Sequence, residues 1–96
     1  MLEIRPTCEN CGKELPPDSD EAYICSFECT YCLTCVEEVL HNVCPNCTGG
    51  FTPRPIRPTK MLLKYPESIK VVSQPVDINK QAGLIEKYNN VAPSER

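Results

Sequence analysis

The stretch from Cys8 to Cys47 decides the fold. It reads CENCGKELPPDSDEAYICSFECTYCLTCVEEVLHNVCPNC and holds all eight cysteines of the 96-residue chain. A stretch of 40 residues cannot enclose a large apolar core, and folds this short usually depend on disulfides or bound metal. The cysteines are therefore predicted to hold this half of the chain together, which excludes an ordinary core-stabilised enzyme domain there.

The spacing of the cysteines is typical of structural zinc. They form four pairs, each with two or three intervening residues: Cys8/Cys11, Cys25/Cys29, Cys32/Cys35 and Cys44/Cys47. A tight turn between two such cysteines can place both thiolates on one ion, and a tetrahedral zinc ion takes four ligands. Eight cysteines therefore supply two structural Zn²⁺ sites, both closed, with no position left for a catalytic water.

Two other uses of clustered cysteines fit less well. Disulfides need an oxidising compartment, and residues 1–7 carry charges and a proline instead of the apolar run of a secretion signal. The run from Cys29 to Cys35 begins like an iron–sulfur ligand series, but Val39 stands where the next cysteine belongs. We therefore expect zinc, in a cytoplasmic protein.

The spacing alone leaves two ways to share four pairs between two ions. In a sequential pairing, the first two pairs bind one ion and the last two bind the other. In a cross-brace, the first and third pairs bind one ion and the second and fourth bind the other. The cross-brace sites would be Cys8, Cys11, Cys32 and Cys35 for the first, and Cys25, Cys29, Cys44 and Cys47 for the second.

The order of the pairs resembles that of a RING finger. That pattern runs C-x2-C, a variable loop, two further pairs in direct succession, a helix-bearing loop and C-P-x-C, and Cys29 occupies the place usually given to histidine. A helix after Cys35 is also expected from the residues themselves, because Val36, Val39 and Leu40 recur at helical spacing. The resemblance implies cross-brace pairing in a small metal-bound α+β fold, a treble-clef-type zinc finger with small hairpins.

Several strings are similar to a family of small bacterial proteins known as domain of unknown function 1272. They are RPTCENCG at residues 5–12, AYICSFEC at 22–29, CPNC at 44–47 and PRPIRP at 53–58. The resemblance covers about residues 1–60. It implies a RING-like double-zinc module over residues 1–58 in a bacterial setting, and it implies no activity.

Residues 59–96 are predicted to form a weakly structured tail after a proline-rich linker. A short helix over 60–65 would be capped by Thr59, and a second would start at Asp77. The apolar residues of the second helix recur at helical spacing: Ile78, Ala82, Ile85 and Tyr88. Because such a helix is marginal alone, it packs on the zinc module, pairs in a homo-oligomer or stays partly disordered. The sequence leaves these alternatives open.

Charge narrows the choice of partner. Residues 1–47 have a net charge of −7 and residues 48–96 have +4. Two four-thiolate zinc sites would take the first half to about −11. Because such a module repels phosphate, nucleic-acid binding through the basic tail is only an alternative. The opposite charges suggest instead that the tail docks on the module. No apolar run approaches the length of a membrane span.

We expect a non-enzymatic module that contacts an unidentified protein. The sequence has no nucleophile–base pair, phosphate loop or carboxylate pair in a recognisable setting. The alternative is a ubiquitin-ligase-like RING, whose groove needs apolar anchors. The first pair encloses Glu9 and Asn10 instead, and the chain has no Trp.

Overall fold

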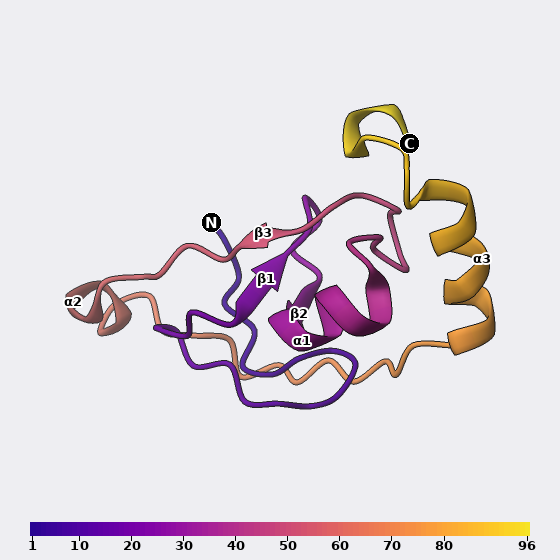
Figure 1. Ribbon diagram of the computed structural model, residues 1–96. Helices are drawn as coiled ribbons and strands as arrows, with labels where there is room; N and C mark the ends of the chain where they lie inside the picture. The colour runs from indigo at the N-terminus through magenta and orange to yellow at the C-terminus, as the bar shows by residue number, and fades with distance from the viewer.

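A computed structural model describes all 96 residues (Figure 1). A three-stranded antiparallel sheet in the order β2-β1-β3 lies at the centre of the first half. Strands β1 (Ala22–Ile24) and β2 (Thr30–Cys32) form a hairpin, and β3 (Thr52–Pro53) pairs along the other side of β1. The proline-rich segment, residues 53–58, therefore begins in an edge strand that completes the sheet.

The helix expected after the third cysteine pair is present. It starts as α1 (Leu33–Cys35), directly after β2, and continues without a break as the π-helical turn η1 (Val36–Leu40). Val36 and Leu40 are buried, whereas the acidic residues between them face solvent. The helix ends at His41, which has a left-handed φ of 48°. The apolar spacing thus predicted both the helix and its buried face.

Cysteines make up most of the core. The buried cluster has eleven residues, of which six are cysteines. Tyr31 lies at its centre, 1 % exposed, and its ring meets that of Phe51 edge-on, with 5.5 Å between centroids. This small α+β unit has too few aliphatic side chains to hold itself together by apolar burial alone.

Two arginines of the proline-rich segment fasten the N-terminal loops to the sheet. Arg54 is 3 % exposed, and its guanidinium donates to the carbonyl oxygens of Arg5, Leu15 and Pro16 at 2.8–3.1 Å. Arg57 donates to the carbonyl oxygen of Leu2 at 2.7 Å. Burial lowers the pKa of Arg54.

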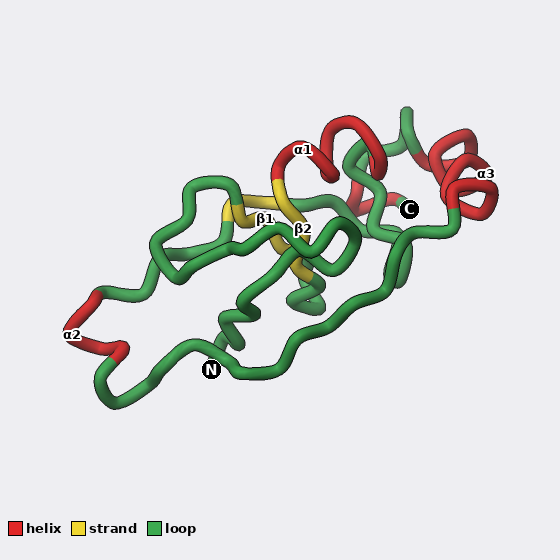
Figure 2. The backbone as a smooth tube through the Cα atoms, turned by 90° about the horizontal axis from the view of Figure 1, so that it is seen from below, coloured by secondary structure: helices red, strands yellow, loops and turns green.

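The tail leaves the module and returns along it (Figures 1 and 2). Helix α2 (Thr59–Leu62) projects at one end, and a segment without regular structure leads from it to α3 (Ile78–Tyr88) and η2 (Pro93–Glu95). The first tail helix is shorter than predicted and begins at Thr59, so the expected cap by this residue is wrong: Pro58 precedes the helix and no side chain caps it.

The second tail helix begins as predicted but buries an unexpected residue. The Asp77 side chain accepts from the N–H groups of Asn79 and Lys80, which confirms the cap. The buried residue of α3 is Gln81, whereas Ile78 is 65 % exposed, so the predicted apolar face is wrong in part. Of the three alternatives predicted for this helix, the structure shows the one in which it packs on the module. Pairing in a homo-oligomer stays a prediction.

No helix in the structure combines the length and the apolarity needed to span a bilayer.

Candidate metal centre

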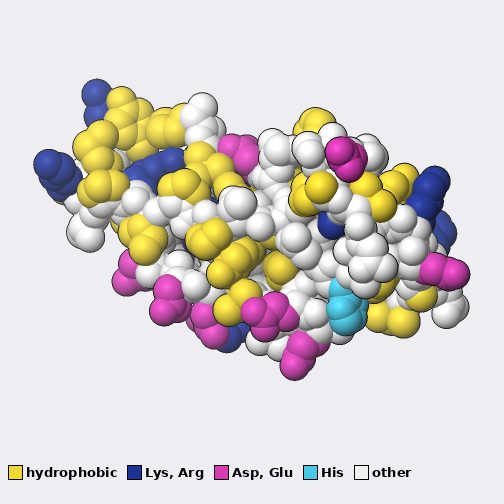
Figure 3. All heavy atoms as spheres, turned by 45° about the horizontal axis from the view of Figure 1, so that its top comes forward, with side chains coloured by type: hydrophobic (Ala, Val, Ile, Leu, Met, Phe, Trp, Pro, Cys, Tyr) yellow, Lys and Arg dark blue, Asp and Glu magenta, His cyan; other side chains and the backbone are white.

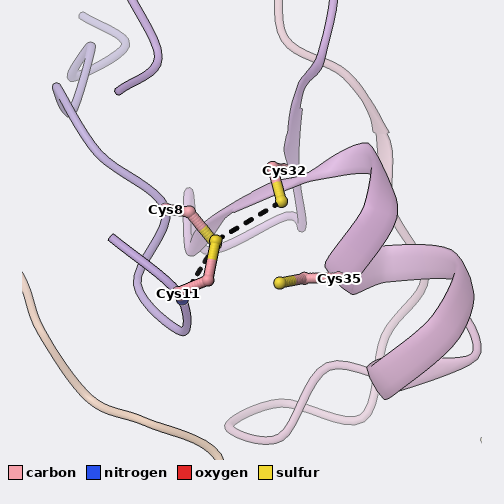
Figure 4. Close-up of side chains that lie close together, drawn as sticks. All are labelled: Cys8, Cys11, Cys32 and Cys35. Carbon is pink, nitrogen blue, oxygen red and sulfur yellow. Dashed lines mark hydrogen bonds between the residues drawn. The ribbon is translucent and has the colours of Figure 1, made fainter. Parts of the chain in front are cut away.

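Four cysteine sulfurs meet between the first cysteine turn and the start of the helix. Their Sγ atoms all lie within 4.8 Å of one another, and Figure 4 shows the side chains pointing toward a common centre. The turn near the N-terminus supplies two, the end of β2 the third and α1 the fourth: Cys8, Cys11, Cys32 and Cys35. This first cysteine group is the set that the cross-brace pairing predicts, whereas the sequential pairing would divide it.

Distances within the first cysteine group suit a tetrahedral metal ion. Zinc–sulfur bonds of about 2.3 Å at tetrahedral angles place the sulfurs about 3.8 Å apart. The Sγ atoms of Cys11 and Cys32 are 3.7 Å apart (Figure 4). The backbone N–H of Cys11 also points at the sulfur of Cys8, at 3.5 Å, and such donors favour a thiolate. These residues therefore fit a zinc ion.

The first and last cysteine pairs have the same turn. In both, the N–H of the first cysteine donates to the carbonyl five residues on, and its own carbonyl accepts from the N–H four residues on. The residue after the second cysteine has a left-handed backbone in each case, with φ of 78° at Gly12 and 65° at Thr48. Glycine adopts this conformation at no steric cost, whereas threonine is strained there. The turn therefore keeps this shape even at a position held by a β-branched residue.

A second cysteine group lies between the β1–β2 hairpin turn and the last cysteine turn. The Sγ atoms of Cys25, Cys44 and Cys47 lie within 4.8 Å of one another. Cys29, which the cross-brace pairing assigns to this site, is outside that set. Its sulfur accepts from Nδ2 of Asn46 at 3.3 Å, at the end of a turn in which Glu28 has a left-handed φ of 65°. The structure thus brings three of these four predicted ligands together.

Burial and hydrogen bonds together set the pKa values of the thiols. Desolvation raises the pKa of Cys32, Cys35 and Cys44. For Cys11, desolvation is the largest single influence and acts upward, but the backbone and thiol hydrogen bonds to its sulfur together lower the pKa. Because a metal binds thiolates, it must displace protons from the buried thiols, and its binding depends on pH.

An asparagine in each Cys-x-Asn-Cys turn bonds to a sulfur across its site. Nδ2 of Asn10 donates to Sγ of Cys35, and Nδ2 of Asn46 donates to Sγ of Cys29, both at 3.3 Å. Each bond acts to lower the pKa of its thiol, against the larger effect of desolvation, which raises it. Neither asparagine was predicted from the sequence to have this role, although the repeated Cys-x-Asn-Cys string is the signal that marks them.

Glu9, the other residue inside the first pair, turns inward. It is 2 % exposed, and its Oε2 accepts from Nη1 of Arg5 at 2.8 Å and from the N–H of Thr30. Its own N–H donates to the carbonyl oxygen of Thr30 at 2.9 Å. This residue therefore fastens the first cysteine turn to β2, beside the third pair, and presents no free charge on the surface.

Comparison with known proteins places the chain in a family. The model of a family described as "Protein of unknown function (DUF1272)" matches residues 1–57, which include all eight cysteines. The uncharacterized protein R02474 of Rhizobium meliloti (strain 1021) is 53 % identical over 75 residues, which is 78 % of this chain and 89 % of the relative. No solved structure matches. The resemblance seen in the sequence strings is thus confirmed, and the chain belongs to the DUF1272 family.

Proposed function

We propose that this protein is a structural zinc module of the bacterial cytoplasm that binds two zinc ions through its eight cysteines and presents a fixed surface to another protein. The observation that carries the proposal is the first cysteine group, in which four sulfurs from two distant segments lie within 4.8 Å of one another. Sulfur-only, tetrahedral ligand sets select zinc or iron–sulfur centres. The cysteine spacing favours zinc.

A structural role follows from the number of ligands. Four thiolates fill the coordination sphere of zinc, so no position remains for water or substrate. Zinc bound in this way would supply the folding free energy that the small core cannot, on the order of 10 kcal/mol per site. The loops held by the two ions would then form the contact surface, in a cross-brace of RING-like type and without catalysis by the chain itself.

Ubiquitin-ligase-like activity is the weaker alternative. A ligase-type RING needs apolar residues that are exposed on its first cysteine turn in the free protein. In the complex with its partner these residues become the buried anchors of the contact. Here that turn carries Glu9, whose carboxylate is bonded inside the module, and Asn10, whose side chain is bonded at both ends. Neither side chain offers such an anchor.

Nucleic-acid binding is a second alternative that is weaker than the proposed structural role. Phosphate contact requires clustered, available Lys and Arg. The three arginines of the basic half all donate to backbone carbonyls of this chain: Arg54, Arg57 and Arg96. Figure 3 shows acidic side chains along one edge of the face it presents, with Lys and Arg toward its two ends. This face therefore offers no continuous basic surface.

The proposal is tested by counting metal ions on the purified full-length protein. Native mass spectrometry with elemental analysis should find two zinc ions per chain, and EDTA should unfold the protein as followed by circular dichroism. An excess of zinc should restore the signal. A single ion, or iron with visible absorbance, would contradict the assignment. For the partner, capture from the native cytosol should depend on zinc and should be lost with the chelated protein.

A further inference from the structure

The side chain of Asn10 connects the first cysteine group to the tail. Its Nδ2 donates to Sγ of Cys35 at 3.3 Å, and its Oδ1 accepts from the backbone N–H of Val76 at 2.9 Å. One amide therefore holds a predicted metal ligand at one end and, at the other, a part of the chain 66 positions away.

Residues 74–76, the clamp segment, lie over the first cysteine turn. The N–H of Gln74 donates to the carbonyl oxygen of Glu9 at 2.8 Å. The side chain of Val76 packs against the buried cluster that contains the cysteines. Both residues inside the first pair, Glu9 and Asn10, are thus bonded to the clamp segment, one through its backbone and the other through its side chain.

Metal on Cys35 changes how firmly the Asn10 amide is held between its two partners. A metal-bound sulfur is a thiolate and can only accept, so it requires the NH₂ end of the amide. The oxygen end then faces Val76, where it is needed as the acceptor. A neutral thiol accepts only weakly, so it holds the same NH₂ end less firmly, and the oxygen that accepts from Val76 is then less well fixed.

We propose that Asn10 couples closure of the clamp segment to metal binding in the first cysteine group. The proposal rests on the zinc function above. Metal on Cys35 strengthens the bond at the NH₂ end of the amide, which fixes the oxygen that accepts from Val76 and so favours the closed clamp segment. Because coupling between two binding events is reciprocal, the closed clamp strengthens metal binding by the same factor. Asn10 is therefore a positioning residue for both.

The other Cys-x-Asn-Cys turn provides a matched control. Asn46 holds the equivalent position and makes the same bond to Cys29, and this is its one side-chain hydrogen bond. Replacing Asn46 removes a donor to a thiol and no contact with the clamp segment. Replacing Asn10 removes both.

The test follows metal and clamp separately in the full-length protein. With ¹¹³Cd in place of zinc, each ion gives its own NMR line, assigned through coupling to the Hβ atoms of its cysteines, and EDTA removes the lines at measurable rates. Amide exchange at Gln74 reports clamp closure. The variants are Asn10→Ala, Asn46→Ala, Val76→Pro, which deletes the clamp N–H, and Val76→Ala, which trims packing but keeps that N–H.

We expect Val76→Pro to speed cadmium loss from the first group about fivefold relative to Val76→Ala and to leave the second group unchanged. Asn10→Ala should speed loss from the first group and exchange at Gln74 together. Asn46→Ala should speed loss from the second group alone. If Val76→Pro frees the Gln74 amide while both ions leave at wild-type rates, clamp and metal are independent and the proposal is wrong. A chain that takes up no metal overturns the zinc function itself, which is a different result.

Discussion

The sulfur atoms of Cys11 and Cys32 lie 3.7 Å apart, although 21 positions separate them in the chain. The contact depends on the bonds between Glu9 and Thr30, which hold the first cysteine turn against β2, the strand that ends at Cys32. The hairpin and the buried carboxylate therefore bring the first and third cysteine pairs together.

This geometry predicts which cysteines share an ion. Cys8→Ser and Cys32→Ser should each cost the ion of the first cysteine group, because each removes one of its four thiolates. Cys44→Ser should cost the other ion. In the ¹¹³Cd spectrum, the first two variants should lose the same line and the third should lose a different one.

A matched pair of variants distinguishes the two pairings. Cys11→Ser and Cys25→Ser would affect the same ion in the sequential arrangement and different ions in the cross-brace. Loss of one common line in these two variants would refute the grouping seen here. The exposed Ser26 provides a control, since Ser26→Ala should leave both lines in place.

Acid should release the metal. Burial raises the pKa of the Cys32, Cys35 and Cys44 thiols, so at neutral pH these sulfurs hold protons that a metal ion must displace. Metal binding therefore releases protons, and affinity falls as the pH falls. Titration calorimetry in two buffers of different ionisation enthalpy should show this release. An uptake that does not depend on pH between 8 and about 5 would show that thiolates are not the ligands.

Local signals in the sequence account for what could be predicted. The cysteine turns, the helix with Val36 and Leu40 on its inner face, and the cap at Asp77 each depend on residues a few positions apart. Such patterns are legible because a turn or a helix is built from short-range bonds. The resemblance to a RING finger added the cross-brace pairing, which spacing alone left open; the first cysteine group agrees with it, and three of the four cysteines assigned to the second site lie together.

Contacts between distant segments account for what could not be predicted. The role of Gln81 depends on partners at least 38 positions away in the chain, and that of Asn10 on a partner 66 positions away. From the sequence alone, polar side chains at these two positions look like ordinary surface residues. The position of the Cys29 sulfur likewise depends on the Asn46 amide, 17 positions on. No periodicity in the sequence records these bonds.

Replacing Gln81 should detach α3 from the module. Its Nε2 donates to the carbonyl oxygens of Leu40 and Val43 at 3.2 and 2.9 Å, and the residue is 2 % exposed. Gln81→Leu keeps most of the volume but leaves two buried carbonyls without this donor, so we expect a loss of about 2 kcal/mol in the free energy of unfolding of this contact. Amide exchange along α3 measures it. Glu86→Ala, on the same helix and exposed, should leave the exchange unchanged.

Replacing Arg54 by lysine should destabilise the whole module. The guanidinium, 3 % exposed, serves three carbonyl oxygens from two N-terminal loops, and a lysine ammonium lacks the planar fork that reaches them together. It would also leave a charge buried with fewer partners. We expect a loss of about 2–4 kcal/mol in the zinc-loaded protein, measured by urea unfolding at fixed free zinc. Arg57→Lys makes the same chemical change at a half-buried position and should cost less. Equal losses in the two variants would mean that burial of Arg54 is not what makes its carbonyl bonds important.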